Sequence, residues 1–334
     1  MKPQSLLLTG GCMLVAEALH GETSMAYHHT FGPAVDRVTS LGWGLATVSL
    51  LVVLIIGVLL LVGIFRKRAS AGAHGLAVRS DSGGVSWIYV GTGISTLVLV
   101  GCMLWTMVVT AAVSRPPSKP ALTLVVTASQ FWWSVRYQGA TTASSFVTAN
   151  EIHIPVGEPV RIELKSADVI HSFWIPQLAG KMDVIPGQTN VSWLQADKPG
   201  DYRGQCAAFC GAQHAHMALL VVAEPASAFA AWQERQLTEM NPEASESEGQ
   251  KVFATHCGVC HTIRGITPAG IRGPDLSHLK TRGTLAAGLL LNTPGNLAAW
   301  IANPQAFKPG ARMPAQILSG AELAAVTSYL NTLD

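Results

Sequence analysis

Two long uncharged stretches near the start of the chain dominate its pattern of hydrophobic and polar positions. Residues 38–65 and 85–113 contain no Asp, Glu, Lys or Arg. Each stretch is longer than the roughly 20 apolar residues that a helix needs to cross a bilayer. Three basic residues, 66–68, follow the first stretch directly. The positive-inside rule therefore predicts a two-helix transmembrane hairpin, residues 25–120, with a cytoplasmic connection and both ends on the opposite, periplasmic side.

The first 24 residues have the pattern of a weak secretion signal. One Lys precedes a short apolar run, and residues 1–24 are interpreted as a signal or leader segment. Cys12 follows two glycines, as in a lipoprotein cleavage site, but Thr9 stands where a Leu is expected. Lipidation at Cys12 is therefore the weaker alternative to a plain leader.

A soluble domain begins after the Pro-rich spacer 115–120, which cannot continue a helix. Short runs rich in β-branched and aromatic residues follow, separated by Gly, Pro and Asp. These runs are 122–127, 132–137, 146–154, 160–164, 190–195 and 218–223. Their spacing predicts an antiparallel β-sandwich over residues 121–224.

The C-terminal part of the chain changes to helical patterning. Residues 225–247 read as a helix followed by an acidic linker, and residues 248–334 as a small all-α domain. Ser245 and Glu248 have the spacing of a capping box at the start of that domain. An amphipathic helix is expected over residues 319–333.

Composition narrows the classes of function. Of the 334 residues, 49% are hydrophobic and 13% charged, which favours a membrane protein. The formal net charge is only +2, and the sequence has no basic run interleaved with aromatic residues. A nucleic-acid partner is therefore excluded.

A cluster of sulfur and nitrogen ligands follows the predicted strands. Cys206, Cys210, His214 and Met217 fall within twelve residues, and His171 is a further candidate upstream. Thiolate and thioether sulfur select soft metals, and the Met favours copper over zinc, which rarely accepts a thioether. The alternatives are a Cys206–Cys210 disulfide and a structural zinc site.

The last domain carries a second cofactor signature. Cys257, Cys260 and His261 form the CxxCH motif, in which two thiols attach a haem covalently and the imidazole becomes an axial ligand. A zinc ribbon would need more cysteines downstream, and the sequence has none. Met313 is the expected second axial ligand. His278 competes with it, but its helix-like surroundings indicate a surface position.

Several smaller patterns give further expectations. Residues 273–276 have the sequence of a loop that packs against the haem histidine, His261. His216 lies two residues from a metal ligand and should point away from the metal. His153 and His256 are expected to have no special role.

Together these features resemble subunit II of a haem-copper cytochrome c oxidase of the caa type. The resemblance rests on two N-terminal membrane helices, a β domain with the CxxxCxxxHxxM motif, and a fused CxxCH domain. It implies a cupredoxin-like domain that holds a dinuclear CuA centre. In that centre the implied roles are Cys206 and Cys210 as bridging ligands, His171 and His214 as one ligand to each copper, Met217 as a weak ligand, and Ala208 as a ligand through its backbone carbonyl.

The resemblance also implies the function. Haem c would take electrons from a cytochrome c or bc-complex donor and pass them to CuA. From there they would reach haem a and CuB in subunit I, where oxygen is reduced to water with proton translocation, in a complex that also includes subunit III. The chain would be an oxidoreductase subunit of the bacterial inner membrane, with its CuA and cytochrome c domains on the periplasmic side. Its own helices lack the histidines of an oxygen site.

The chain departs from the family pattern at several positions, and two of them bear on metal binding and on electron entry. Relatives usually carry a Glu at position 208, whose carboxylate serves an interfacial magnesium or manganese, and this chain has Ala208. Relatives also place the electron-accepting Trp directly after a Gln, where this chain has Phe131. Electron entry is therefore assigned to Trp132 or Trp133, or to the haem edge.

Two other functions fit parts of the sequence. One is the CuA and haem c electron-input subunit of a nitric oxide reductase, whose distinguishing residues belong to another chain. The other is a membrane-anchored copper-delivery protein. A quinol oxidase subunit is disfavoured because that group lacks the copper cysteines.

Overall fold

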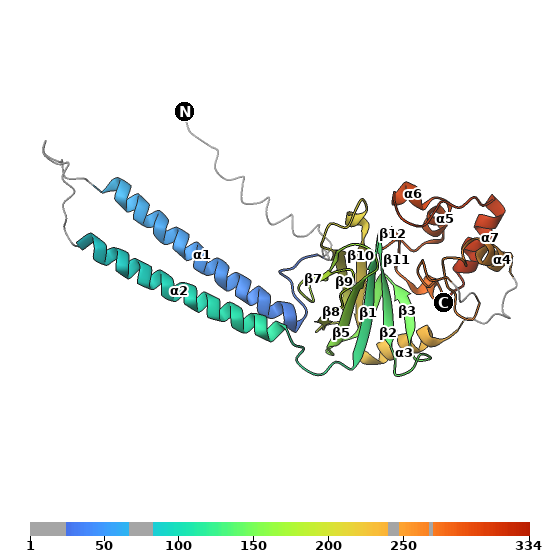
Figure 1. Cartoon of the computed structure of the whole chain (residues 1–334), viewed down its shortest axis with the longest axis horizontal. Helices are drawn as coiled ribbons and strands as arrows, with labels where there is room; N and C mark the ends of the chain where they lie inside the picture. Colours follow the sequence, from blue (N-terminus) through green and yellow to red (C-terminus); the bar gives the residue numbers. More distant parts are fainter. Residues whose placement is uncertain (1–24, 67–82, 240–246, 267–269) are drawn as a thin grey trace, which may run out of the picture. The chain divides into compact units, whose positions relative to one another are not determined.

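The computed structural model describes residues 25–66, 83–239, 247–266 and 270–334 (Figure 1). The expected leader with Cys12, most of the basic connection and Ser245 lie outside these residues. The chain forms two compact units. One is residues 36–115, and the other joins residues 116–334 to the described residues before Asp36.

Two long helices make up most of the smaller unit. Helix α1 spans Pro33–Phe65 and α2 spans Gly83–Val113. Their most apolar windows reach mean hydropathies of 3.2 and 2.2, so both are long and apolar enough to cross a membrane. Helix α1 starts five residues before the uncharged stretch, because Pro33 suits the first helical turn and Asp36 complements its dipole.

The larger unit begins with a β-sandwich of two five-stranded sheets, as predicted. The first sheet contains β1 (Leu122–Ser129), β2 (Trp132–Gln138), β3 (Phe146–Ala149), β5 (Val160–Ser166) and β8 (Asn190–Leu194), in the order β3-β2-β1-β5-β8. The second contains β4 (Glu151–Pro155), β6 (His171–Trp174), β7 (Met182–Val184), β9 (Gly200–Cys206) and β10 (Ala218–Glu224), in the order β4-β10-β9-β6-β7. Every second side chain of the central strands faces the core, as for Leu124, Val126 and Ala128, which are fully buried.

The predicted strand over residues 146–154 is wrong as a single element. Asn150 has a φ of 60°, a left-handed conformation that Asn tolerates better than most residues. Its backbone N–H donates to the carbonyl of Trp133 over 2.9 Å, and its side-chain oxygen accepts from the N–H of Trp133 over 2.8 Å. The chain therefore leaves the first sheet after β3 and enters the second as β4.

The prediction of a purely antiparallel sandwich is also wrong. Strand β1 pairs with β5 in parallel, and β10 pairs with β4 in parallel. Neither pair is consecutive in sequence, because parallel neighbours need a connection that crosses over. The sequence pattern also missed β6, β7 and β9. In β9, polar and glycine residues hide the alternation that buries Tyr202 and Cys206.

Helices form the rest of the larger unit. Helix α3 (Ala226–Leu237) packs Phe229 and Trp232 into the sandwich core. Four further helices are α4 (Glu248–His256), α5 (Pro294–Ala302), α6 (Pro304–Phe307) and α7 (Gly320–Leu330), and a short hairpin is formed by β11 (Thr284–Leu285) and β12 (Leu290–Leu291). Phe253 and Val326, both fully buried, are at the centre of this second core.

Helix caps define where two of these helices begin. The side chain of Ser247 accepts a hydrogen bond from the N–H of Gln250, so Ser247 caps α4, whereas the expected cap Ser245 lies outside the described residues. Ser319 and Glu322 form a complete capping box at the start of α7, where the terminal helix was predicted.

Candidate metal centre and haem site

The candidate metal ligands lie where strands of the second sheet begin or end. His171 is the first residue of β6, Cys206 is the last residue of β9, and Met217 directly precedes β10. Strand β6 pairs with β9 so that Phe173 is opposite Cys206. This pairing brings His171 close to a motif that follows it by 35 residues.

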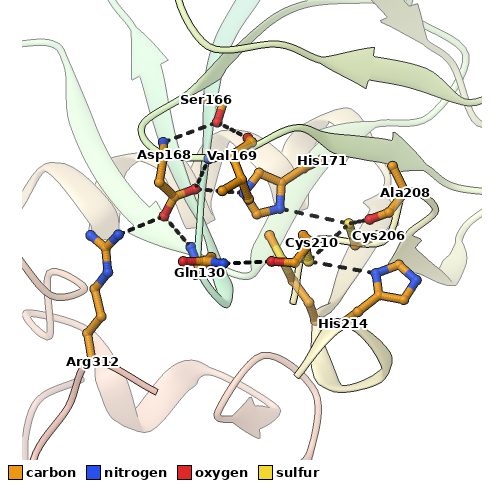
Figure 2. A network of polar contacts seen from close by, with 11 residues as sticks. Gln130, Ser166, Asp168, Val169, His171, Cys206, Ala208, Cys210, His214 and Arg312 are labelled. Carbon is orange, nitrogen blue, oxygen red and sulfur yellow. Dashed lines mark hydrogen bonds and ion pairs between the residues drawn. The ribbon is translucent and has the colours of Figure 1, made fainter. Parts of the chain in front are cut away.

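Six potential donor atoms converge at this place. Figure 2 labels their residues except Met217. The sulfurs of Cys206 and Cys210 are 3.9 Å apart. Nδ1 of His171 lies 3.9 Å from the Cys206 sulfur, and Nδ1 of His214 lies 3.7 Å from the Cys210 sulfur. The Met217 sulfur is 3.8 Å from that of Cys210, and the Ala208 carbonyl oxygen is 3.3 Å from that of Cys206. The structure thus brings together every residue predicted for this centre.

These separations fit shared metal ligands and exclude a disulfide. A disulfide has an S–S distance of about 2.05 Å, far shorter than the 3.9 Å between Cys206 and Cys210. Ligands held 2.0–2.3 Å from one tetrahedral ion lie roughly 3.3–3.8 Å apart. A thioether and a backbone carbonyl beside two thiols and two imidazoles favour copper over a structural zinc site.

Asp168 fixes the orientation of His171. Its Oδ1 is 2.8 Å from Nε2 of His171, and a carboxylate can only accept, so Nε2 carries the proton. Nδ1 is therefore the ring nitrogen that faces the Cys206 sulfur: a protonated ring can donate from it to the thiolate, and a neutral ring presents a lone pair there for a metal. The other carboxylate oxygen, Oδ2, accepts from the backbone N–H of Gln130 over 2.7 Å, and the Gln130 side chain donates to the carbonyl of Cys210 over 2.6 Å. A carboxylate that orients a ligand histidine is a common support of metal sites.

The charges around the two thiols favour one thiolate in the metal-free protein. Burial raises the pKa of Cys206, but hydrogen bonds from His171 and from backbone groups outweigh this effect and bring the pKa to about 7. Burial and the negative charge of Cys206 raise the pKa of Cys210 to about 12. A metal ion would bring the positive charge needed to ionise both thiols.

The structure distinguishes between the two tryptophans proposed for electron entry. Trp133 is fully buried, and its indole ring centre lies 6.1 Å from the ring centre of His171. Its Nε1 donates to the carbonyl of Met217 over 3.5 Å. Trp132 is half-buried and points to the other face of β2, as strand alternation requires. Phe131 is buried with 6% of its surface exposed.

The haem motif presents its histidine in the form that binds iron. Nδ1 of His261 is 2.8 Å from the carbonyl oxygen of Pro274, which can only accept, so Nδ1 is protonated and Nε2 keeps its lone pair. Burial lowers the pKa of His261 and favours this neutral form. A Cβ at Gly273 would come within 2.6 Å of the ring, so only glycine fits there. The contacts confirm that residues 273–276 orient His261.

The remaining histidines differ from each other. His216 is exposed, as expected, and hydrogen-bonds to the Gln213 side chain over 2.6 Å. The predicted surface position of His278 is wrong, because only 3% of its surface is exposed. His153 also has more partners than expected. It stacks on Trp232 at a ring distance of 4.1 Å and hydrogen-bonds to two glutamates.

Three supporting residues were missed by the sequence interpretation: Asp168, Gln130 and Arg312. Asp168 lies three residues before His171, and this spacing was the available signal. Gln130 and Arg312 are 38 and 144 residues from Asp168 in sequence, so local patterns could not reveal their contacts. The predicted axial ligand Met313 is half-buried, and its carbonyl accepts from the Gln305 side chain over 2.7 Å.

Two family matches cover most of residues 116–334. Residues 139–224 match the family described as "Cytochrome C oxidase subunit II, periplasmic domain", and residues 246–334 match "Cytochrome c". The first match begins after β2, although β1 and β2 belong to the same sandwich.

Similar proteins carry related names. A cytochrome c oxidase subunit 2 from Alkalihalophilus pseudofirmus is 39% identical over 212 residues, which are 62% of this chain and 60% of the relative. One from Bacillus sp. strain PS3 is 31% identical and covers 64% and 63% of the two chains. The chain thus spans about three fifths of these relatives.

A solved structure adds a further match. The periplasmic domain of subunit II of cytochrome oxidase from Bradyrhizobium japonicum is 32% identical, with a TM-score of 0.33, and the match covers 36% of this chain and 95% of that one. With both family matches and the convergent ligands, this chain joins a domain of the cytochrome c oxidase subunit II family to a cytochrome c domain.

Proposed function

We propose that the chain is the electron-entry subunit of a bacterial respiratory terminal oxidase, with a dinuclear CuA centre and one covalent haem c. The observation that carries this proposal is the convergence of six donor atoms from two separate segments of the chain. Five belong to residues 206–217, namely the sulfurs of Cys206, Cys210 and Met217, the imidazole of His214 and the carbonyl of Ala208, and the sixth is the imidazole of His171 on the neighbouring strand β6. Figure 2 shows these residues except Met217 with labels.

The proposed roles at the copper site follow from the positions of the donors. Cys206 and Cys210 lie at the centre of the set and would be shared by the two metal ions, while His171 and His214 would each hold one of them. Met217 and the Ala208 carbonyl complete the set. When bound, the copper pair supplies a centre that takes up and releases one electron. Burial of both cysteines and of Met217 keeps water away from it.

The roles at the haem follow the same logic. Cys257 and Cys260 provide the two thioether attachments, and His261 is the proximal ligand because its Nε2 is free. Met313 is the proposed sixth ligand, and a thioether there raises the haem potential. Burial and the neighbouring Cys260 raise the pKa of Cys257 to about 11, so the unattached thiol is protonated.

Membrane anchoring and partners complete the proposal. Helices α1 and α2 cross the bacterial inner membrane and hold the soluble domains on its periplasmic side. A cytochrome c or bc-complex donor reduces haem c. The electron continues to the copper pair and then to subunit I, with its haem a and CuB, in a complex that also includes subunit III. Oxygen is reduced to water there, with proton translocation.

Trp133 is the favoured aromatic relay next to the copper site. It contacts the carbonyl of Met217 and lies beside His171, whereas Trp132 is on the opposite face of the strand. Trp132 is half-exposed and remains the candidate for contact with an external donor.

The test uses the purified complex and electron paramagnetic resonance. The unmodified chain should give the mixed-valence signal of a copper pair, and Cys210→Ser should abolish it while haem c stays attached. Cys102→Ser, a change of a half-buried thiol in α2, is the matched control and should keep the signal. An unchanged copper signal in Cys210→Ser, or consumption of nitric oxide in place of oxygen, would overturn the proposal.

A further inference from the structure

The cytochrome c domain contacts the copper-ligand loops through a short segment next to the predicted haem ligand. Residues 308–313 end in Met313, and three of these residues bond to the sandwich. Lys308, only 3% exposed, donates through Nζ to the carbonyls of Phe131 over 2.7 Å and Ala286 over 2.9 Å. The Gln213 side chain donates to the carbonyl of Pro309 over 2.9 Å.

The third contact reaches a residue that supports a copper ligand. Nη2 of Arg312 donates to Oδ2 of Asp168 over 3.0 Å. The same carboxylate accepts from Nε2 of His171 through Oδ1 (Figure 2). Asp168 therefore touches the residue before Met313 on one side and the His171 imidazole on the other. Three side chains, those of Arg312, Asp168 and His171, thus form a continuous series from the residue next to Met313 to a predicted copper ligand.

From this arrangement we propose that Arg312 is a positioning residue that sets the docking of the cytochrome c domain on the copper domain. It holds the segment carrying Met313 against the loop carrying His171, with Asp168 as the shared anchor. The inference rests on the proposed function, because it names the residue that fixes the position of the haem domain relative to the copper site. The step it serves transfers one electron from reduced haem to the oxidised copper pair, with no bond broken and no proton moved.

The exposure of Arg312 and Asp168 indicates that their ion pair positions the domain and contributes little to its folding stability. The Asp168 side chain is 9% exposed and the Arg312 side chain is 63% exposed. An ion pair with one largely solvated partner contributes little to folding. The buried Lys308 amine and the backbone contacts support the interface itself. The guanidinium of Arg312 offers its donors in a fixed plane and is therefore suited to set the orientation of the cytochrome c domain on the copper domain.

The experiment compares variants of the full chain in the assembled complex. Arg312→Ala should slow electron transfer from photoreduced haem c to the copper pair by on the order of tenfold or more, because small misplacements lower rates steeply. Faster hydrogen exchange at the amides of residues 309–313 should accompany the slower transfer. The haem should stay attached and the mixed-valence copper signal should remain.

Three further variants extend the test: two at Arg312 and one control at Lys251. Arg312→Lys keeps the charge and should restore part of the rate, whereas Arg312→Asp faces the Asp168 carboxylate and should be slower than Arg312→Ala. Lys251→Ala removes an exposed positive charge from α4 of the same domain and should leave rate and exchange unchanged.

The possible failures can be told apart. A transfer rate in Arg312→Ala within twofold of the unmodified protein, with both cofactor signals present, would overturn the role of Arg312 alone. An equal loss of transfer rate in Lys251→Ala would show a general effect of removing positive charge and would also overturn the role of Arg312. Absence of the two-copper signal or of covalent haem in the unmodified protein would overturn the proposed function and this inference together.

Discussion

The imidazole of His261 donates a hydrogen bond from Nδ1 to the carbonyl oxygen of Pro274 over 2.8 Å. The bond fixes the ring so that only Nε2 is available to iron, and the absence of a side chain at Gly273 lets the loop pack directly on the ring. Contacts that already exist in the protein would thus orient the proposed proximal ligand.

We expect Met313→Ala to leave the haem attached but to change its electronic state. The two thioether bonds and His261 do not depend on residue 313, so covalent haem should persist. Loss of the thioether should lower the haem midpoint potential by on the order of 100 mV and leave the reduced iron high-spin. Redox titration and optical spectra measure both.

The matched variant is His278→Ala, which removes the competing ligand. It should keep the low-spin spectrum, although loss of a buried side chain will reduce stability. A change of spin state in His278→Ala, with none in Met313→Ala, would transfer the ligand assignment to His278.

Trp133 should matter more for the stability of the sandwich than its neighbour. Its side chain is fully buried against Phe173, with ring centres 5.6 Å apart, whereas Trp132 is half-buried. Trp133→Ala should lower the free energy of unfolding by about 3–5 kcal/mol, and Trp132→Ala by clearly less. Urea denaturation of the copper-loaded protein, followed by absorption of the copper site, measures this difference, and equal losses would contradict the assigned burial.

Glu151 gives the protein a stability that depends on pH. Burial raises its pKa, but the hydrogen bond and charge of His153 and the N–H of Gly283 outweigh burial, so the folded-state pKa lies below 4.5. The folded protein therefore binds fewer protons than the unfolded chain in acid. The contribution of Glu151 is complete above about pH 4.5 and is lost as the pH falls through the folded-state pKa.

Thermal unfolding of the solubilised chain between about pH 6 and pH 3 tests this dependence. Glu151→Gln should flatten the loss of stability in acid relative to the unmodified chain. Glu158→Gln, a change at an exposed position, should leave the profile unaltered. Identical profiles for all three proteins would show that Glu151 does not contribute.

Most of the correct predictions came from the spacing of residues that lie close together in the sequence. The CxxxCxxxHxxM loop needs only a tight turn after one strand to gather four ligands, so its spacing predicted their convergence. The position of His171 depended on knowing that its segment pairs beside β9. That pairing was not visible in the sequence, which marked His171 only as an upstream candidate. The family resemblance supplied its role as a ligand and did not predict the pairing.

The errors have a common physical origin in contacts between distant segments. The turn at Asn150 is set by bonds to Trp133 on a neighbouring strand, so the run of β-forming residues around it predicted one strand where two exist. His278 is buried by tertiary packing that its own polar neighbours do not indicate. The local sequence around Arg312 is that of an exposed arginine, and only its contact with the distant Asp168 indicates a role.

The hairpin turn between β11 and β12 has a conformational cost that contacts within its own domain offset only in part. Ala286, Ala287 and Gly288 have φ values of 54°, 62° and 79°, and left-handed backbone is unfavourable by roughly 1–2 kcal/mol at each alanine. The carbonyl of Ala286 receives the Lys308 amine, and that of Ala287 receives the N–H of Ala218, which directly follows Met217. A cytochrome c domain cut free of the sandwich would lose the second bond and tend to relax the turn. Fusion to the sandwich therefore helps to set the conformation of this turn. A separately expressed cytochrome c fragment should not reproduce that conformation fully.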